Sequence, residues 1–166
     1  MKKVFILACL MAVVAVNAMA EKKPWKIIDM EDVVRAGGNC DYDDETCTAT
    51  FTGPYDRWID LPGVSGDLSD HTVIDLNILK STCMLRVVVV YKASDGTEKQ
   101  EEATTFYHSM KRTITEPKVV TVDLAKNGNI TTEMLENVVY IRIAMSKAVD
   151  DNAEPWITQF GKTVIY

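Results

Sequence analysis

The sequence predicts an all-β protein, specifically an antiparallel β-sandwich, and three observations lead to this prediction. Short stretches that alternate apolar and polar residues recur along the chain, and clusters of Gly, Pro, Asn and Asp separate them. The pattern supports only one short helical turn. The 166 residues are 47% hydrophobic and 25% charged, which is the composition of a globular domain. Many short strands with turns between them favour two packed sheets.

The beginning of the chain has the pattern of a removable secretory signal peptide. Two lysines and a long uncharged run follow Met1, and Ala18 and Ala20 form an A-x-A cleavage site. The uncharged run is shorter than the roughly 20 apolar residues that a membrane-spanning helix needs. We therefore expect residues 1–20 to be a signal peptide and residues 21–166 to be one β-sandwich domain. The mature protein is expected to be secreted or periplasmic, with no membrane span.

Five strands are predicted in the first half of the mature chain. Residues 46–52 alternate threonines with Ala49 and Phe51, which is typical of a half-buried strand. The two longest candidates each have one wholly apolar side, which must pack on an opposing sheet. The acidic stretch 40–47 is expected to be a loop. The predicted strands are 24–30, 46–52, 57–61, 72–80 and 83–92.

The second half of the mature chain continues this pattern. Ser94-Asp95-Gly96-Thr97 is a hairpin turn signal, and the returning strand is polar enough to lie near a sheet edge. Thr131 or Thr132 can cap one short helical turn that ends at Glu136. Gly161-Lys162 interrupts the closing segment. The predicted strands are 98–108, 118–124, 138–145 and 156–166.

The cysteines that remain after removal of Cys9 with the signal peptide have different expected roles. In an oxidising compartment Cys40 and Cys47 are natural partners for a disulfide. Cys83 begins an apolar strand and is expected to be a buried free thiol. The spacing of Cys and His residues does not fit a zinc site.

Polar and aromatic side chains stand in the middle of the long strands, on the sides opposite the apolar ones. They are Asn77, Arg86, Tyr140 and Arg142. Arginine and tyrosine combine apolar planes with hydrogen-bond donors, and such a surface suits sugar rings. A plain solvated sheet face would carry the same residues, so a ligand groove and a solvated face are both open. The candidates for an aromatic platform are Trp58, Tyr55, Tyr107, Tyr140 and Trp156.

Several short motifs follow one another in a characteristic order, namely Ile27-Ile28-Asp29-Met30-Glu31, Trp58-Ile59-Asp60-Leu61, Thr72-Val73-Ile74-Asp75-Leu76, Thr121-Val122-Asp123-Leu124 and Asn137-Val138-Val139-Tyr140-Ile141-Arg142-Ile143. This order resembles the galactose-binding-like jelly roll of many non-catalytic carbohydrate-binding modules, over most of residues 25–166. The chain is also similar to small secreted proteins of Bacteroides-type bacteria. The resemblance implies a jelly roll of eight or nine strands that binds a glycan at its loops or on a concave sheet face.

The same resemblance implies that one structural calcium is often bound. Glu31 is the calcium candidate, because the acid of the opening strand often lies near that ion in such modules. The acidic stretch 40–47 offers further oxygen ligands, which calcium prefers, but its spacing does not match an EF-hand loop. A solvated acidic loop is the alternative, and no other cofactor is expected.

The sequence argues against an enzyme and against nucleic acid as a partner. It lacks the G-x-S-x-G and H-E-x-x-H motifs. Glycosidases need two carboxyl groups that face each other about 5–10 Å apart, and neighbouring acids in a loop do not predict this. A net charge of −6 does not suit phosphate binding.

We therefore predict an exported, non-catalytic protein that binds an oligo- or polysaccharide. The predicted ligand-binding residues are Trp58, Asn77, Arg86, Tyr140 and Arg142. The alternative is a structural or protein-interaction module of the cell envelope that has no glycan ligand. The polar strand at 98–107 supports that alternative, because a sheet edge can pair with another chain.

Overall fold

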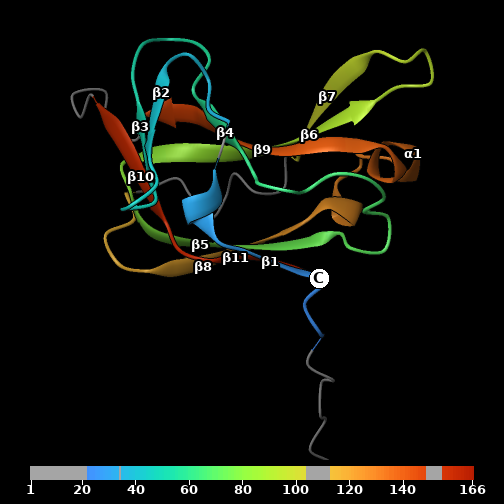
Figure 1. The fold of residues 1–166 in the computed structure, drawn as a ribbon, viewed down its shortest axis with the longest axis horizontal. Helices are drawn as coiled ribbons and strands as arrows, with labels where there is room; N and C mark the ends of the chain where they lie inside the picture. The colour runs from blue at the N-terminus through green and yellow to red at the C-terminus, as the bar shows by residue number, and fades with distance from the viewer. Residues whose placement is uncertain (1–21, 34, 104–112, 149–154) are drawn as a thin grey trace, which may run out of the picture.

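The computed structural model describes residues 22–33, 35–103, 113–148 and 155–166, which form two antiparallel sheets packed face to face (Figure 1). The predicted signal peptide and Tyr107 lie outside these residues. In chain order the elements are β1 (Lys26–Ile28), η1 (Met30–Asp32), β2 (Cys40–Asp43), β3 (Thr48–Phe51), β4 (Trp58–Asp60), β5 (Val73–Ser81), β6 (Cys83–Lys92), β7 (Glu98–Ala103), β8 (Lys118–Asp123), η3 (Leu124–Lys126), α1 (Thr132–Glu136), β9 (Val138–Ala148), β10 (Trp156–Phe160) and β11 (Thr163–Ile165).

The strand order defines a jelly roll. Within the described residues, the larger sheet has seven strands in the order β1-β11-β5-β10-β3-β2, with β8 on the other side of β5. The smaller sheet has four strands in the order β4-β9-β6-β7. The chain from β3 to β10 therefore winds between β3-β10-β5-β8 in one sheet and β4-β9-β6-β7 in the other, which is jelly-roll topology. This confirms the predicted all-β sandwich and the jelly-roll fold that the resemblance implies.

The apolar sides of the long strands form the core between the sheets. Leu76 in β5, Val87 in β6 and Ile143 in β9 are each 0% exposed. Alternate residues of a strand point to opposite faces, so the residues between them face outward. The alternation that predicted these strands thus also decides which side chains are available on the outer faces.

The predicted helical turn is present and is capped as expected. The Thr131 hydroxyl accepts a hydrogen bond from the Met134 N–H at 3.3 Å, at the start of α1. Within the described part of the chain, none of the helices is long and apolar enough to span a bilayer.

The acidic cysteine stretch corrects two predictions. It forms β2 and a turn into β3, not a loop, and the register of this hairpin pairs Cys40 with Phe51 and Asp43 with Thr48. Cys47 immediately precedes Thr48, the partner of Asp43, and so lies four positions along the hairpin from Cys40. Four strand residues span about 13 Å, whereas Cα atoms joined by a disulfide are at most about 7 Å apart. The two thiols are accordingly free, and the expected bridge is absent from the structure.

Burial makes these thiols poor nucleophiles. Desolvation, aided by the nearby Asp41 carboxylate, raises the pKa of Cys40 to about 12. Cys83 is the buried free thiol that the sequence predicts, since it is 0% exposed. Its sulfur lies 3.3 Å from the Thr158 hydroxyl, and desolvation raises its pKa.

Candidate functional site

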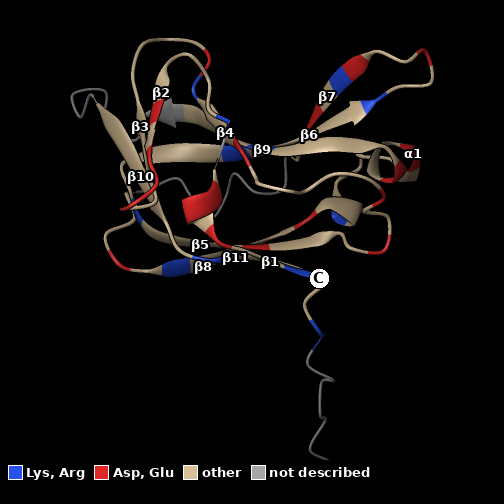
Figure 2. Ribbon diagram, in the orientation of Figure 1, with Lys and Arg blue, Asp and Glu red and all other residues tan. Residues whose placement is uncertain are grey.

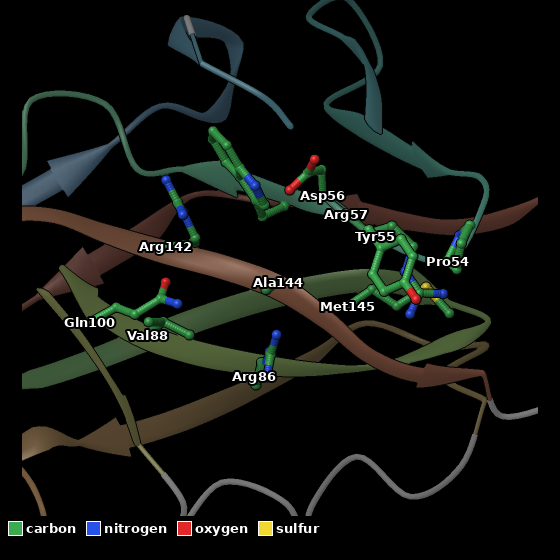
Figure 3. A pocket seen from close by; sticks show the side chains of 11 residues that line it. Pro54, Tyr55, Asp56, Arg57, Arg86, Val88, Gln100, Arg142, Ala144 and Met145 are labelled. Atoms are coloured by element: carbon green, nitrogen blue, oxygen red, sulfur yellow. The ribbon is translucent and has the colours of Figure 1, made fainter. Parts of the chain in front are cut away.

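A hollow of about 290 Å³ lies on the outer face of the smaller sheet (Figure 3). Strands β4, β6, β7 and β9 contribute its floor, and the segment before β4 forms a wall. The lining residues are Pro54, Tyr55, Asp56, Arg57, Trp58, Arg86, Val88, Gln100, Arg142, Ala144 and Met145. An adjoining hollow of about 210 Å³ shares Arg86, Val88 and Gln100 and extends toward Glu101 and Glu102 of β7.

The register of the sheet brings these side chains together from distant parts of the sequence. Ala144 pairs with Trp58 on one side and with Arg86 on the other. In the next outward-facing row, Arg142 pairs with both Asp60 and Val88. Because directly opposite residues in antiparallel strands share a face, the rows bring aromatic, aliphatic and charged groups together on one surface.

The floor of the hollow is apolar and covered, although it faces away from the core. Val88 is 5% exposed and Ala144 is 4% exposed. Long guanidinium side chains and the Trp58 ring surround them in the lining. Arginine and tryptophan side chains can cover apolar surface while keeping their polar groups accessible. The surface therefore offers apolar planes and hydrogen-bond donors side by side.

Arg142 is held in place by two strong contacts. Its Nε and Nη2 donate to the two carboxylate oxygens of Asp60 at 2.7 and 3.1 Å, and the Asp60 side chain is 3% exposed. Its Cζ lies 3.6 Å from the centroid of the Trp58 ring. Bidentate pairing and stacking together fix both the guanidinium and the indole.

Arg35 adds a second cation to this arrangement. Its Nε lies 3.7 Å from the second carboxylate oxygen of Asp60. Its Cζ lies 4.4 Å from the Tyr140 ring and 5.7 Å from the Trp58 ring. Asp60 is thus the shared anion of two arginines that stack on two aromatic rings.

Arg86 is held less completely. Its Nη1 donates to Glu102 at 3.1 Å across the strand pair. Its Nε is buried and has no hydrogen-bond partner among the described residues. A buried donor without a partner costs about 1–3 kcal/mol, so the Arg86 guanidinium is less completely satisfied than that of Arg142.

The wall before β4 is fixed by backbone contacts. The Asn39 side-chain amide donates to the Tyr55 carbonyl at 2.7 Å, and the Met145 N–H donates to the Arg57 carbonyl at 2.8 Å. Gly37 allows the close approach of this segment, because a Cβ there would lie 2.0 Å from the Asp56 carbonyl oxygen. The Arg57 guanidinium lies 5.6 Å from the Trp156 ring centroid. The wall is therefore a built part of the fold.

Three of the five predicted ligand-binding residues meet in the hollow. Trp58, Arg86 and Arg142 all line it. Tyr140 lies on the same outer face as Arg142, two residues away along β9, but it contacts Arg35 and does not line either hollow.

Asn77 lies elsewhere, on β5 of the larger sheet. The sequence predicted that it shares a ligand-binding surface with Arg86, because both residues lie in the middle of long strands, opposite the apolar side. The short connection at Thr82 instead carries the chain from one sheet to the other, so the outward sides of β5 and β6 face in opposite directions. The Asn77 carbonyl accepts a hydrogen bond from the Gly161 N–H at 2.8 Å, far from the hollow in topology.

The calcium candidate occupies an open position. Glu31 is exposed in η1, and its backbone N–H lies 3.5 Å from an Asp29 carboxylate oxygen. In the acidic hairpin, the Asp43 carboxylate accepts a hydrogen bond from the Thr46 N–H, which lowers the pKa of Asp43. Within the described residues, no three acidic, histidine or cysteine side chains are grouped so that they could hold a metal ion.

Four residues that complete the site were not among the predicted ligand-binding residues, namely Arg35, Arg57, Asp60 and Gln100. Asp60 could have been found, because it is two residues from Trp58 in a strand and so shares its face. Arg35, Arg57 and Gln100 carried no such signal, because their positions depend on the packing of distant segments. Alternation identifies which residues face outward, but only the sheet order shows which of them are neighbours.

Comparisons with known proteins give a structural likeness and no family. No protein-family model matches the chain, and no curated protein matches it either. Among solved structures, the chain is similar to the family 30 carbohydrate-binding module of the cellulosomal cellulase Cel9D-Cel44B of Clostridium thermocellum. The TM-score is 0.42 with 13% sequence identity, and 72% of each chain is covered. A likeness at this level carries no information about the ligand. The fold class, a jelly-roll β-sandwich, is defined by the two sheets themselves.

Proposed function

We propose that this is an exported, non-catalytic carbohydrate-binding protein, and that the glycan binds in the hollow on the smaller sheet. The observation that carries the proposal is the meeting of Trp58, Arg86 and Arg142, from three different strands, in one hollow. The pattern of a secretory signal peptide at residues 1–20 supports export.

The chemistry of the hollow suits a sugar ring. A pyranose has C–H faces that pack on aromatic and aliphatic groups, and here Trp58, Val88 and Ala144 supply such groups. Its hydroxyls need directed partners, which the guanidinium groups and the Gln100 amide supply. Because Asp60 already fixes Arg142, less side-chain entropy is lost on binding than with free arginines.

The shape supports an oligosaccharide as ligand. The two adjoining hollows share Arg86, Val88 and Gln100, so they form one groove that runs across β6 toward β7. Binding sites of small ligands are concave and combine apolar lining with a few polar groups, as this groove does.

The carboxylates near the groove support binding without catalysis. Among the described lining residues of the larger hollow, Asp56 is the one carboxylate. Asp60 and Glu102 are engaged by Arg142 and Arg86, and Glu101, which lines the adjoining hollow, accepts a hydrogen bond from the Asn129 amide at 2.6 Å. Hydrolysis of a glycosidic bond needs two carboxyl groups facing each other across the bond, one of them able to donate a proton.

Glycan-array binding of the mature chain, followed by affinity electrophoresis on the ligands found, tests the proposal. Trp58→Ala and Tyr55→Ala are expected to weaken binding at least tenfold, because each removes an aromatic surface of the hollow. Tyr55 is 75% exposed, so its removal leaves the fold intact. Trp25→Ala is the matched control, because Trp25 is 40% exposed and stacks on His71 away from the hollow.

Two results would contradict the proposal. One is that the array shows no carbohydrate ligand for the folded protein. The other is that Trp58→Ala and Tyr55→Ala bind as tightly as Trp25→Ala does. The protein-interaction alternative is less well supported, since β7 at the edge of the smaller sheet has the sequence EKQEEA, and charged edges discourage strand pairing.

A further inference from the structure

The lining of the larger hollow has the opposite charge to the rest of the chain. The protein has a net charge of −6, and acidic residues are spread over the loops and strand ends of both sheets (Figure 2). The described lining of the larger hollow nevertheless contains Arg57, Arg86 and Arg142 against one carboxylate, that of Asp56. The three arginines come from three separate segments, so no run of basic sequence explains their meeting.

Two of these guanidinium groups keep donors that the protein itself does not use. Arg57 stacks near Trp156 and forms no ion pair with the described residues. Arg86 is held by Glu102 through Nη1 alone, and its side chain is 43% exposed. The Nε and Nη2 of Arg142, by contrast, both donate hydrogen bonds to Asp60. The available positive charge is therefore at Arg57 and Arg86.

On the basis of the proposed function, we infer that the glycan is acidic and that its carboxylate or sulfate group binds at Arg57 and Arg86. Guanidinium N–H groups can only donate hydrogen bonds, and an ionised carboxylate or sulfate can only accept them. A neutral sugar presents hydroxyls that also need acceptors, and the described side chains of the lining offer few, namely the Asp56 carboxylate, the Gln100 amide oxygen and the Tyr55 hydroxyl.

The acidic character of the chain makes this local positive charge necessary. A polyanionic ligand is repelled by a protein of net charge −6 unless the binding surface supplies cations. Charge-assisted hydrogen bonds are roughly twice as strong as neutral ones. The adjoining hollow is lined by Glu101 and Glu102, whose negative charges repel an anion. We therefore expect the anionic group of the ligand at the Arg57 end of the groove.

A glycan array that carries uronate-containing and sulfated oligosaccharides beside their neutral counterparts tests the inference. The acidic glycan that binds best is then compared with its methyl ester or its desulfated form by calorimetry. We expect the acidic form to bind at least tenfold more tightly than the neutral form. This preference is expected to shrink when the NaCl concentration is raised about tenfold, from 50 to 500 mM, because salt screens the charges. The array arms distinguish a carboxylate from a sulfate.

Variants locate the anion. Arg57→Gln is expected to weaken binding of the acidic form at least tenfold more than it weakens binding of the neutral form. Arg57→Lys, which keeps the charge, is expected to retain most of the preference. Lys80→Gln is the control with the same change of charge, because Lys80 is exposed on β5 of the other sheet.

The possible failures of the two proposals differ. Equal binding of acidic and neutral forms, or an Arg57→Gln variant that keeps the full preference, overturns the acidic ligand and leaves the carbohydrate function in place. An array on which the folded protein binds neither acidic nor neutral glycans overturns both.

Discussion

Apolar residues on the outer face of the smaller sheet are covered, whereas some on the outer face of the larger sheet are exposed to solvent. On the smaller sheet, Val88 and Ala144 are 5% and 4% exposed although they point away from the core. On the larger sheet, Ile27 in β1 and Val119 in β8 are 59% and 57% exposed, and both strands lie at the edges of that sheet. Val88 and Ala144 lie in the two central strands of the smaller sheet, so their burial reflects both that position and the side chains that lie over them.

What lies over the smaller sheet is a connected set of side chains. Asp60 holds Arg142, Arg142 stacks on Trp58, and Arg35 joins Asp60 to the Tyr140 ring. On the larger sheet, an example of a polar contact on the outer face is the hydrogen bond from the Thr121 hydroxyl to Asp75. A solvated face needs no set of linked arginines and rings, so the set on the smaller sheet supports the proposal that the site lies there.

The strongest test of this contrast is the removal of the central anion on each face. Asp60→Ala leaves the Arg142 guanidinium, which is 16% exposed, without its bidentate partner. Breaking a buried pair from one side is strongly destabilising, so we expect a loss of about 3 kcal/mol in the free energy of unfolding in urea. Asp75→Ala is the control on the larger sheet and is expected to cost less than about 1 kcal/mol. Equal losses would show that the two faces are alike.

A glycine pair tests whether the wall of the hollow is built into the fold. At Gly37 a Cβ would lie 2.0 Å from the Asp56 carbonyl oxygen and 2.9 Å from the Trp58 Nε1, whereas at Gly38 nothing lies within 4 Å. Overpacking costs typically about 1–3 kcal/mol. We expect Gly37→Ala to lose about 2 kcal/mol of stability and to bind glycan more weakly, because the wall must move.

Gly38→Ala is the matched control for that variant. It is expected to keep both the stability and the glycan affinity of the parent within error. If the two alanine variants behave alike in urea denaturation and in binding, the Gly37 contact does not hold the wall.

Much of the fold was predictable because its signals are local. The apolar alternation of β5, β6 and β9 predicted both the strands and their buried sides, and Thr131 predicted the start of α1. The hairpin of Cys40 and Cys47 was not predictable in this way, because a disulfide expectation depends on the separation of two residues in space. Its register, and not its sequence spacing, sets that separation.

The site was predictable only in part, for a related reason. Trp58, Arg86 and Arg142 could be selected because each faces outward from an otherwise apolar strand. Asn77 satisfied the same rule and yet belongs to the other sheet. Local alternation gives the face of a strand but not its sheet, and the crossing at Thr82 carries no strong signal.

A smaller effect distinguishes the two faces by the same substitution. Val88→Thr places a hydroxyl in a covered position opposite Glu102, whose carboxylate already pairs with Arg86, and we expect a loss of about 1–2 kcal/mol. Val119→Thr on the larger sheet is expected to change stability by less than about 0.5 kcal/mol, because that side chain is 57% exposed. Thermal and urea unfolding of the two variants measure the difference, and equal costs would remove the contrast between the faces.

The smallest expected effect is the change in folding stability at acid pH, and we expect the two sheets to respond alike. In the turn between β6 and β7, hydrogen bonds from the Thr97 hydroxyl and N–H lower the pKa of Asp95 to about 2. At the end of β8, the Lys126 ammonium lowers the pKa of Asp123. A carboxyl whose pKa is lowered on folding stabilises the fold fully above its unfolded pKa, and this contribution is lost as the pH falls through the folded value.

For Asp95 that window lies between its ordinary value of 3.8 and about 2. Carboxyl chemical shifts followed by NMR measure both pKa values, and unfolding in urea at several pH values measures the consequence. The stability difference between the parent and Asp95→Asn is expected to be present at pH 6 and to vanish near pH 2. An Asp95 carboxyl that titrates at its ordinary pKa would show that the turn contacts do not persist in solution. Because this turn lies at the edge of the smaller sheet, away from Asp60, its acid response leaves the contrast between the two faces unchanged.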